Sequence, residues 1–283
     1  MVPQCYPSGA SIPATVMTRI TSRRSPIVAR YRAAARGEPA DVMLLDGPHL
    51  LTEAIASGVR LLHVTARADA VDTPEIAAVL RAAGARRTDV ACASAAVMEA
   101  ISPVRSSSAV AALAARPVCN LEKLFGPSAL TVIACDVQDP GNLGAIVRVA
   151  EAGGASGVVA GAASADPFGW KALRGSMGSA FRLPVIQQRD VAAALSDART
   201  RGCRILATIP RGGRSPFDID LTTPAAVLIG GEGAGLSDAM VRAADDRITI
   251  PMRAPVESLN SAVAAAVVVY EANRQRGGMQ PRT

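Results

Sequence analysis

The sequence has few aromatic residues and no long apolar run. Aromatic residues make up only 3% of the chain although hydrophobic residues make up 49%, so we expect alanine-rich helices packed on valine-rich strands. The uncharged run Ser258 to Tyr270 has 13 residues, fewer than the ~20 of a membrane span. No cationic start followed by an apolar core precedes Arg19, so no signal peptide is predicted. We expect a soluble, cytoplasmic protein.

Several ligand-binding motifs are missing. The five cysteines have no CxxC spacing and no histidine nearby, which argues against a zinc site or a disulfide framework, so no metal is predicted. The segment GGEGAGLS does not complete GxGxxG, because Leu236 stands where the third glycine belongs. No GxxxxGK[ST] occurs either, so neither a dinucleotide fingerprint nor a P-loop is predicted.

Acidic residues are absent from the start of the chain. Six arginines, Arg19 to Arg36, precede the first acidic residue, Glu38, and the remaining 24 basic residues balance the 24 acidic ones. The whole net charge of +6 therefore lies in one N-terminal segment. Such a segment could bind a polyanion such as RNA; the alternative is a solvated helix face.

At 283 residues the chain is long enough for two domains. Apolar runs alternate with segments of helical periodicity in both halves, which predicts α/β domains with parallel pairing as the default. We expect a flexible basic leader (1–23), a first domain (24–118), a linker (119–127), a second domain (128–276) and a flexible tail (277–283).

Three predicted strands of the second half are followed by loops with unusual residues, and ligands of open α/β sheets bind beyond the carboxyl ends of strands. After ALTVIACD, a turn contains Asn142, and Arg148 follows six residues later in a helix. After AAVLIG, four glycines surround Glu232. After RITIPM, Ser258 is predicted to cap the last helix, with Asn260 in its first turn.

These loops resemble the three motifs of the SpoU/TrmH family of RNA methyltransferases. DPGNLGAIVRVAEAGG is similar to the first motif, GGEGAGLS to the second, and IPMRAPVESLNSAVAAAVVVYE to the third, in the family's order and spacing. The N-terminal half is similar to the family's ribosomal-protein-like substrate-binding domain. Two positions depart from the family pattern: Asp46 stands where glutamate is more usual, and Ser261 where the third motif often has valine.

The resemblance implies an α/β fold in which a smaller N-terminal α/β domain precedes a trefoil-knotted methyltransferase domain with a parallel sheet. It also implies S-adenosylmethionine as cofactor and a homodimer. The implied cofactor-binding residues are Gly230, Gly231, Gly235, Ile250, Met252 and Leu259. The implied catalytic set is Asn142, Arg148, Glu232, Ser258 and Asn260. The candidate RNA-binding residues are Arg19, Arg23, Arg24, Arg30, Arg32 and Arg174.

The expected reaction is methyl transfer to a ribose 2′-hydroxyl of RNA, with ribosomal RNA favoured over transfer RNA. Asn142 would orient the ribose, and Arg148 would bind the neighbouring phosphate and activate the hydroxyl electrostatically, because guanidinium stays protonated in proteins. Glu232 and Asn260 would hold Arg148, and Ser258 would fix the last helix. The alternatives are a transfer-RNA ribose or base methyltransferase of the same superfamily and a non-catalytic RNA-binding relative.

Overall fold

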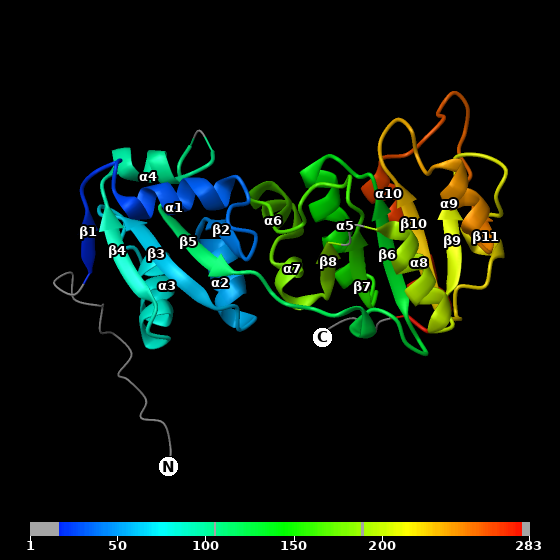
Figure 1. Ribbon diagram of the computed structural model, residues 1–283, viewed down its shortest axis with the longest axis horizontal. Helices are drawn as coiled ribbons and strands as arrows, with labels where there is room; N and C mark the ends of the chain where they lie inside the picture. The colour runs from blue at the N-terminus through cyan, green and yellow to red at the C-terminus, as the bar shows by residue number, and fades with distance from the viewer. Residues whose placement is uncertain (1–16, 105, 188–189, 279–283) are drawn as a thin grey trace, which may run out of the picture. The chain divides into compact units, whose positions relative to one another are not determined.

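The computed structural model describes residues 17–104, 106–187 and 190–278. The chain forms two compact units, one ending at Arg116 and the other beginning at Pro117. Each unit contains one sheet with helices on both faces (Figure 1). Among the described residues, no helix is long and apolar enough to cross a membrane. The prediction of an α/β fold with a parallel sheet is confirmed.

The first unit has a five-stranded sheet in the order β1-β4-β3-β5-β2. Its strands are β1 (Thr18–Ile20), β2 (Val42–Asp46), β3 (Leu61–Arg67), β4 (Asp89–Ala93) and β5 (Val110–Ala115). Its helices are α1 (Pro26–Ala35), α2 (Pro48–Ala56), α3 (Pro74–Ala85) and α4 (Ala95–Ile101). Three of these helices begin at a proline, whose fixed φ suits the first helical position and whose missing N–H is not needed there.

Helices α1 and α4 cover one face of this sheet, and α2 and α3 cover the other (Figure 1). Successive side chains of a strand point to opposite faces, so Ala91 and Ala93 of β4 join the core under α1 and α4. Tyr31 of α1 is fully buried in that core. The sheet contributes both small and large side chains to this core, among them Ala111, Leu44 and Leu113.

Strand β5 differs from the expected parallel pairing, because it runs antiparallel to both of its neighbours, β2 and β3. The reason lies in Asp46, the last residue of β2. Its buried carboxylate accepts hydrogen bonds from the hydroxyls of Ser102 (3.1 Å) and Ser108 (2.9 Å). These bonds hold the loop before β5 at the carboxyl end of β2, so the chain must enter β5 from that end.

The prediction of a flexible leader through residue 23 is wrong for the described part of that segment. Residues Thr18–Ile20 form β1, which pairs in parallel with β4 at the edge of the sheet, and Ile20 is buried in the core. The burial of Ile20 and the bonds to β4 give this short segment a fixed place. Residues 1–16 of the predicted leader lie outside the described residues.

The second unit has a six-stranded sheet in the order β11-β9-β10-β6-β7-β8, and every pairing in it is parallel. Its strands are β6 (Leu130–Cys135), β7 (Gly157–Ala160), β8 (Val185–Gln187), β9 (Arg204–Thr208), β10 (Ala225–Gly230) and β11 (Asp246–Ile248). Its α-helices are α5 (Pro140–Ala152), α6 (Trp170–Ser176), α7 (Ser179–Arg182), α8 (Val191–Thr200), α9 (Asp238–Ala243) and α10 (Ser261–Gln275). Two 3-10 turns, η2 (Leu121–Lys123) and η3 (Pro216–Asp218), complete it.

The central strands of this sheet are buried on both faces, which is why they appear in the sequence as continuous apolar runs. Helix α8 packs on one face, and α5 and α10 pack on the other. The segment expected to be a linker, 119–127, lies within this unit, where Leu124 and Phe125 are part of the buried core. From residue 279 on, the predicted tail lies outside the described residues.

Candidate active site at the carboxyl ends of β6 and β10

The first two candidate loops are neighbours because β6 and β10 pair directly, with Cys135 opposite Gly230 at their carboxyl ends. After β6 the chain turns into α5, where Asp139 caps the helix by accepting a hydrogen bond from the backbone N–H of Asn142 (2.8 Å). This cap fixes the position of Asn142 in the first turn. Burial, and then the neighbouring Asp136, raises the pKa of the Cys135 thiol to about 12, so this sulfur stays protonated beside the site.

The side chain of Asn142 joins residues from three distant segments. Its Nδ2 donates a hydrogen bond to Oε1 of Glu232, in the loop after β10. Its Oδ1 accepts a hydrogen bond from Nδ2 of Asn260, just before α10 (3.0 Å). Both ends of the amide are therefore engaged, and its orientation is fixed. The structure brings together Asn142, Glu232 and Asn260 of the predicted catalytic set.

The cap of α10 is Asn260, not Ser258 as predicted. Oδ1 of Asn260 accepts hydrogen bonds from the backbone N–H groups of Ala262 (2.9 Å) and Val263 (3.3 Å). Both residue types suit an N-cap, and the bond to Asn142 favours Asn260, because one side chain then holds both the helix and the site. Ser258 is exposed two residues earlier and makes no hydrogen bond with the described residues.

A cavity of about 420 Å³ opens beside this cluster. All six residues predicted to bind the cofactor line it: Gly230, Gly231, Gly235, Ile250, Met252 and Leu259. Glu232, Ser258 and Asn260 line it as well.

The glycines are required by the close approach of backbones around the cavity. A Cβ on Gly230 would lie 2.6 Å from the carbonyl carbon of Gly235, and one on Gly231 would lie 1.9 Å from the carbonyl oxygen of Asp136. Gly235 has φ +66, which side chains rarely adopt. The second motif thus forms a tight backbone wall with polar N–H and C=O groups close to the cavity.

Sequence reasoning missed part of the lining. Thr208, Ile209 and Pro210, at the carboxyl end of β9, also line the cavity, as do Ser261 and Ala264 of α10. The end of β9 could have been suspected from the rule on strand ends. Its place beside β10, however, depends on the order of strands in the sheet, which the sequence does not reveal.

Arg148 is not part of the Asn142 cluster within one chain. It is exposed on α5 and makes no hydrogen bond or ion pair with the described residues. Six helical residues separate it from Asn142, which corresponds to about 9 Å along the axis and roughly a third of a turn away from its face. The predicted support of Arg148 by Glu232 and Asn260 is therefore wrong for this chain alone, since both hold Asn142 instead.

The predicted RNA-binding arginines are distributed over both units. Arg19 lies on β1, Arg23 and Arg24 lie between β1 and α1, and all three are exposed. The remaining residues are also exposed: Arg30 and Arg32 on α1 and Arg174 on α6. Nε of Arg32 donates to the carbonyl of Ala100 (3.0 Å), so that side chain also ties α1 to α4. Among the described residues, no group of three or more metal-ligating side chains is gathered.

Comparisons with known proteins show which family the chain resembles. Residues 129–270 match the model of the SpoU rRNA Methylase family. An uncharacterised tRNA/rRNA methyltransferase of Synechocystis is 40% identical over 140 residues, 50% of this chain and 51% of that protein. The 23S rRNA (guanosine(2553)-2′-O)-methyltransferase RlmP of Bacillus subtilis is 36% identical over 154 residues, 54% of this chain and 62% of that protein. The chain thus spans about half to three-fifths of the length of these relatives.

Solved structures resemble the chain over most of its length. The SpoU methyltransferase AviRb of Streptomyces viridochromogenes, in complex with AdoMet, has a TM-score of 0.82 and 28% identity over 90% of this chain and 100% of that one. An AdoMet-bound rRNA methyltransferase of Sinorhizobium meliloti has a TM-score of 0.80 and 28% identity over 91% of this chain and 98% of that one.

Proposed function

The chain belongs to the SpoU rRNA Methylase family, and we propose that it transfers a methyl group from S-adenosylmethionine to a ribose 2′-hydroxyl of RNA. The observation behind this proposal is the cavity of about 420 Å³ beside the hydrogen-bonded cluster of Asn142, Glu232 and Asn260. Ligand cavities typically have about 300–1,000 Å³. Relatives crystallised with AdoMet support the choice of cofactor.

The residues around the cavity suit a ligand with a flat apolar part and a charged polar part. Ile250, Met252 and Leu259 provide apolar contacts, and the backbone of the glycine loop provides hydrogen-bonding groups. When bound, S-adenosylmethionine supplies a methyl group on a positively charged sulfur. Asn142 lies beside this cavity in a fixed orientation and positions the ribose, while Glu232 and Asn260 are positioning residues that hold it.

Arg148 contributes positive charge near the reacting hydroxyl in this proposal. Because a guanidinium stays protonated, it binds the phosphate next to the target ribose and stabilises the negative charge that develops on the 2′-oxygen. Ser258 is exposed and lines the cavity, so its hydroxyl is available to a bound ligand. Ribosomal RNA is the proposed substrate, supported by the similarity to RlmP, a 23S rRNA methyltransferase, and to the rRNA methyltransferase of Sinorhizobium meliloti.

We propose that the protein acts as a homodimer and that its second unit contains a trefoil knot. Apolar side chains are exposed on α10 and just before it, with Val263 and Tyr270 two helical turns apart at 47% and 52% exposure. A second copy of the chain would cover them. The knot is supported by the likeness to SpoU structures and by the path from edge strand β11 to α10, which packs against α5.

Two measurements test the activity. Calorimetry with S-adenosylmethionine is expected to give one binding site per chain. The absence of binding heat from a folded sample, both with and without RNA, would contradict the enzyme assignment. Ribosomal and transfer RNA from cells lacking the protein are then methylated, digested to nucleosides and analysed by mass spectrometry. A 2′-O-methylnucleoside from ribosomal RNA is expected. A methylated base, a transfer-RNA product, or cofactor binding without any product identifies one of the alternatives.

A further inference from the structure

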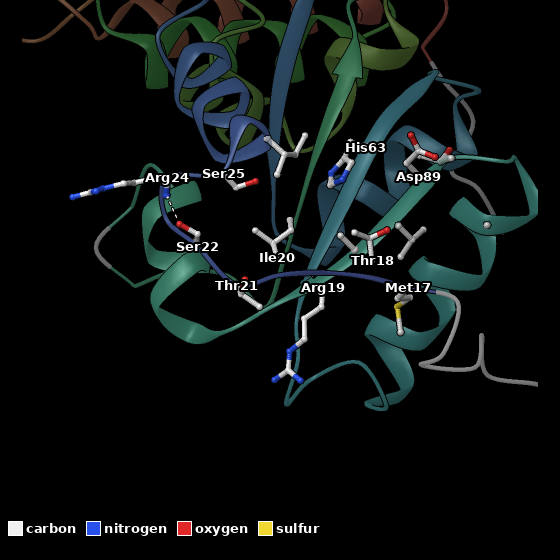
Figure 2. A pocket seen from close by; sticks show the side chains of 15 residues that line it. Met17, Thr18, Arg19, Ile20, Thr21, Ser22, Arg24, Ser25, His63 and Asp89 are labelled. Carbon is white, nitrogen blue, oxygen red and sulfur yellow. Dashed lines mark hydrogen bonds between the residues drawn. The ribbon is translucent and has the colours of Figure 1, made fainter.

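A groove of about 960 Å³ borders the edge strand β1 of the first unit (Figure 2). Its lining comes from β1 and the residues next to it, the start of α1, His63 of β3, Gly84 of α3, and the first residues of β4 with Thr88 before them. The register pairs His63 with Asp89 and Thr18 with Ala91, so these side chains share the face of the sheet that α1 covers. Ala91 is buried under α1, whereas Thr18 and Asp89 are exposed and His63 is half-buried, so the open part of the groove lies beside these three residues.

His63 is held rigidly in the groove wall. Its Nδ1 lies 3.0 Å from the hydroxyl of Tyr31 and 3.3 Å from that of Thr65. The Tyr31 and His63 rings also meet edge to face, with centroids 5.8 Å apart. The other ring nitrogen, Nε2, has no hydrogen-bond partner among the described residues. Burial lowers the pKa of His63 below its ordinary value, so near neutral pH the ring is an uncharged hydrogen-bonding group.

Asp89 provides a pair of acceptors next to this ring. Its side chain is exposed, and its carboxylate accepts no hydrogen bond from the residues that the structure describes. An ionised carboxylate can only accept, through two oxygens. Among the four RNA bases, only guanine presents two adjacent donors, N1–H and N2–H, on one edge. An exposed carboxylate at the groove therefore matches the edge of guanine better than that of adenine, cytosine or uracil.

The rim of the groove is positively charged. Arg24 lines it near the start of α1, and Figure 2 shows its side chain extending outward. Arg19 also borders the groove, but its side chain leaves β1 on the side opposite Thr18 and Ile20. Arg30 of α1 lies close enough to affect the titration of His63. A planar base in the groove would thus have cations around it for its own phosphate and for those of flanking nucleotides.

We propose that this groove binds an unpaired guanine nucleotide of the substrate RNA, with Asp89 accepting from N1–H and N2–H and His63 bonding to the base through Nε2. The proposal rests on the proposed function only in that it takes RNA as the ligand. It places a base-reading site in the first unit, separate from the cavity beside Asn142.

The test measures binding of labelled hexanucleotides to the full chain by fluorescence anisotropy. We expect UUGUUU to bind about tenfold more tightly than UUAUUU, as one bidentate base contact typically achieves. Asp89→Asn should remove this preference while leaving the affinity for UUAUUU unchanged. The control is Asp72→Asn, because Asp72 is an exposed aspartate of the same unit and is not among the groove residues. This variant should keep the preference for UUGUUU. Equal binding of the two hexanucleotides, or a preference that survives Asp89→Asn, overturns the proposal.

Two further arms separate possible failures. Guanosine 5′-monophosphate should compete only weakly with UUGUUU. If it displaces UUGUUU at equal concentration, the ligand of the groove is a free nucleotide and the assignment to RNA is overturned. Calorimetry with S-adenosylmethionine on the same samples reports on the other cavity. A guanine preference without cofactor binding refutes the proposed function alone, and cofactor binding with methyl transfer but no guanine preference refutes the groove alone.

Discussion

At the scale of single residues, Asn142 and Arg148 have different relations to the rest of the site. Asn142 is bonded at both ends of its amide, by Glu232 and by Asn260. Arg148 is exposed and without a described partner on α5. The side chain of Asn142 is therefore held in place before any ligand binds. The side chain of Arg148 is instead free to bind a phosphate of the proposed RNA substrate.

Arg148→Ala should leave cofactor binding nearly unchanged and slow methyl transfer by about 10² to 10⁴, or roughly 3 to 5 kcal/mol of barrier, if its charge stabilises the reacting oxygen. Single-turnover kinetics with saturating RNA measure the rate. Arg242→Ala on α9, an exposed arginine without a described partner, should behave like the unchanged protein. A loss smaller than fivefold removes Arg148 from the mechanism, and a loss of RNA affinity alone leaves it only a phosphate contact.

Ser261, which replaces the valine frequent in the third motif, has a buried hydroxyl with no hydrogen-bond partner in the described residues. An unsatisfied buried hydroxyl costs about 1–3 kcal/mol, so Ser261→Ala should raise the free energy of unfolding by about 1 kcal/mol. Urea denaturation measures it. The matched control is Ser176→Ala, because the buried hydroxyl of Ser176 donates to the carbonyl of Leu173 (2.9 Å); this variant should be less stable. A destabilised Ser261→Ala would show that the hydroxyl has a partner in solution.

At the scale of secondary-structure elements, the C-terminal end of α10 is bound to the rest of the second unit through Arg276. Its guanidinium donates hydrogen bonds to four carbonyls, those of Ser128 (2.8 Å), Ala129 (3.1 Å), Leu221 (2.8 Å) and Thr223 (2.8 Å). These carbonyls lie in the segments that precede β6 and β10. One side chain thus joins the last helix to the beginnings of the two strands whose other ends form the site.

Arg276→Leu should lower the free energy of unfolding by about 2–4 kcal/mol, because several partly buried carbonyls lose a charged donor at once. Arg276→Lys keeps the charge but cannot reach all four carbonyls. Its free energy of unfolding should therefore lie between those of the unchanged protein and Arg276→Leu. Arg242→Leu is the exposed control and should change stability by less than about 0.5 kcal/mol. Denaturation of the three variants in urea gives the ranking. Equal stabilities for Arg276→Leu and Arg242→Leu would mean that water replaces the guanidinium without cost.

The elements that the sequence predicts well are those with a strong local pattern. Burial of apolar side chains decides the structure of these elements. For this reason the sequence alone predicts β6 and β10 from their apolar runs, and α5 and α10 from their helical periodicity. The direction of β5 could not be predicted, since it depends on bonds between Asp46 and a loop more than fifty residues later. The choice of Asn260 over Ser258 as helix cap likewise depends on Asn142, 118 residues away.

At the scale of the whole molecule, the net positive charge lies in the N-terminal segment that ends before Glu38, and part of this segment belongs to the folded first unit. Arg19 is on β1, whose neighbour Ile20 is buried. Deleting residues 1–24 would therefore remove a strand as well as charge. Substitution of side chains is the better test of whether these charges bind RNA.

The triple variant Arg19→Gln, Arg23→Gln, Arg24→Gln should reduce the slope of log affinity against log salt by about 2 to 3, because each lost phosphate contact removes about 0.7 to 0.9. RNA binding over a salt series measures the slope. The methylated nucleotide should stay the same, since phosphate contacts do not specify sequence.

The charge-matched control is the triple variant Arg60→Gln, Arg81→Gln, Arg86→Gln, which removes three exposed arginines of the same unit outside the basic segment. It should leave the slope nearly unchanged. Equal slopes for the two triple variants would mean that the N-terminal arginines are a solvated surface without a special role.

The walls of the proposed cofactor cavity come from segments that leave the ribosome at different times. The ends of β9 and β10 are made first, and the residues from Ser258 to Ala264 that close the cavity are made last. Because Asn260 both starts α10 and bonds to Asn142, a growing polypeptide that has not reached this point lacks part of the cavity wall and one of the two hydrogen bonds that hold the Asn142 amide. A prematurely terminated copy that lacks α10 would therefore lack the arrangement on which the proposed methyl transfer depends.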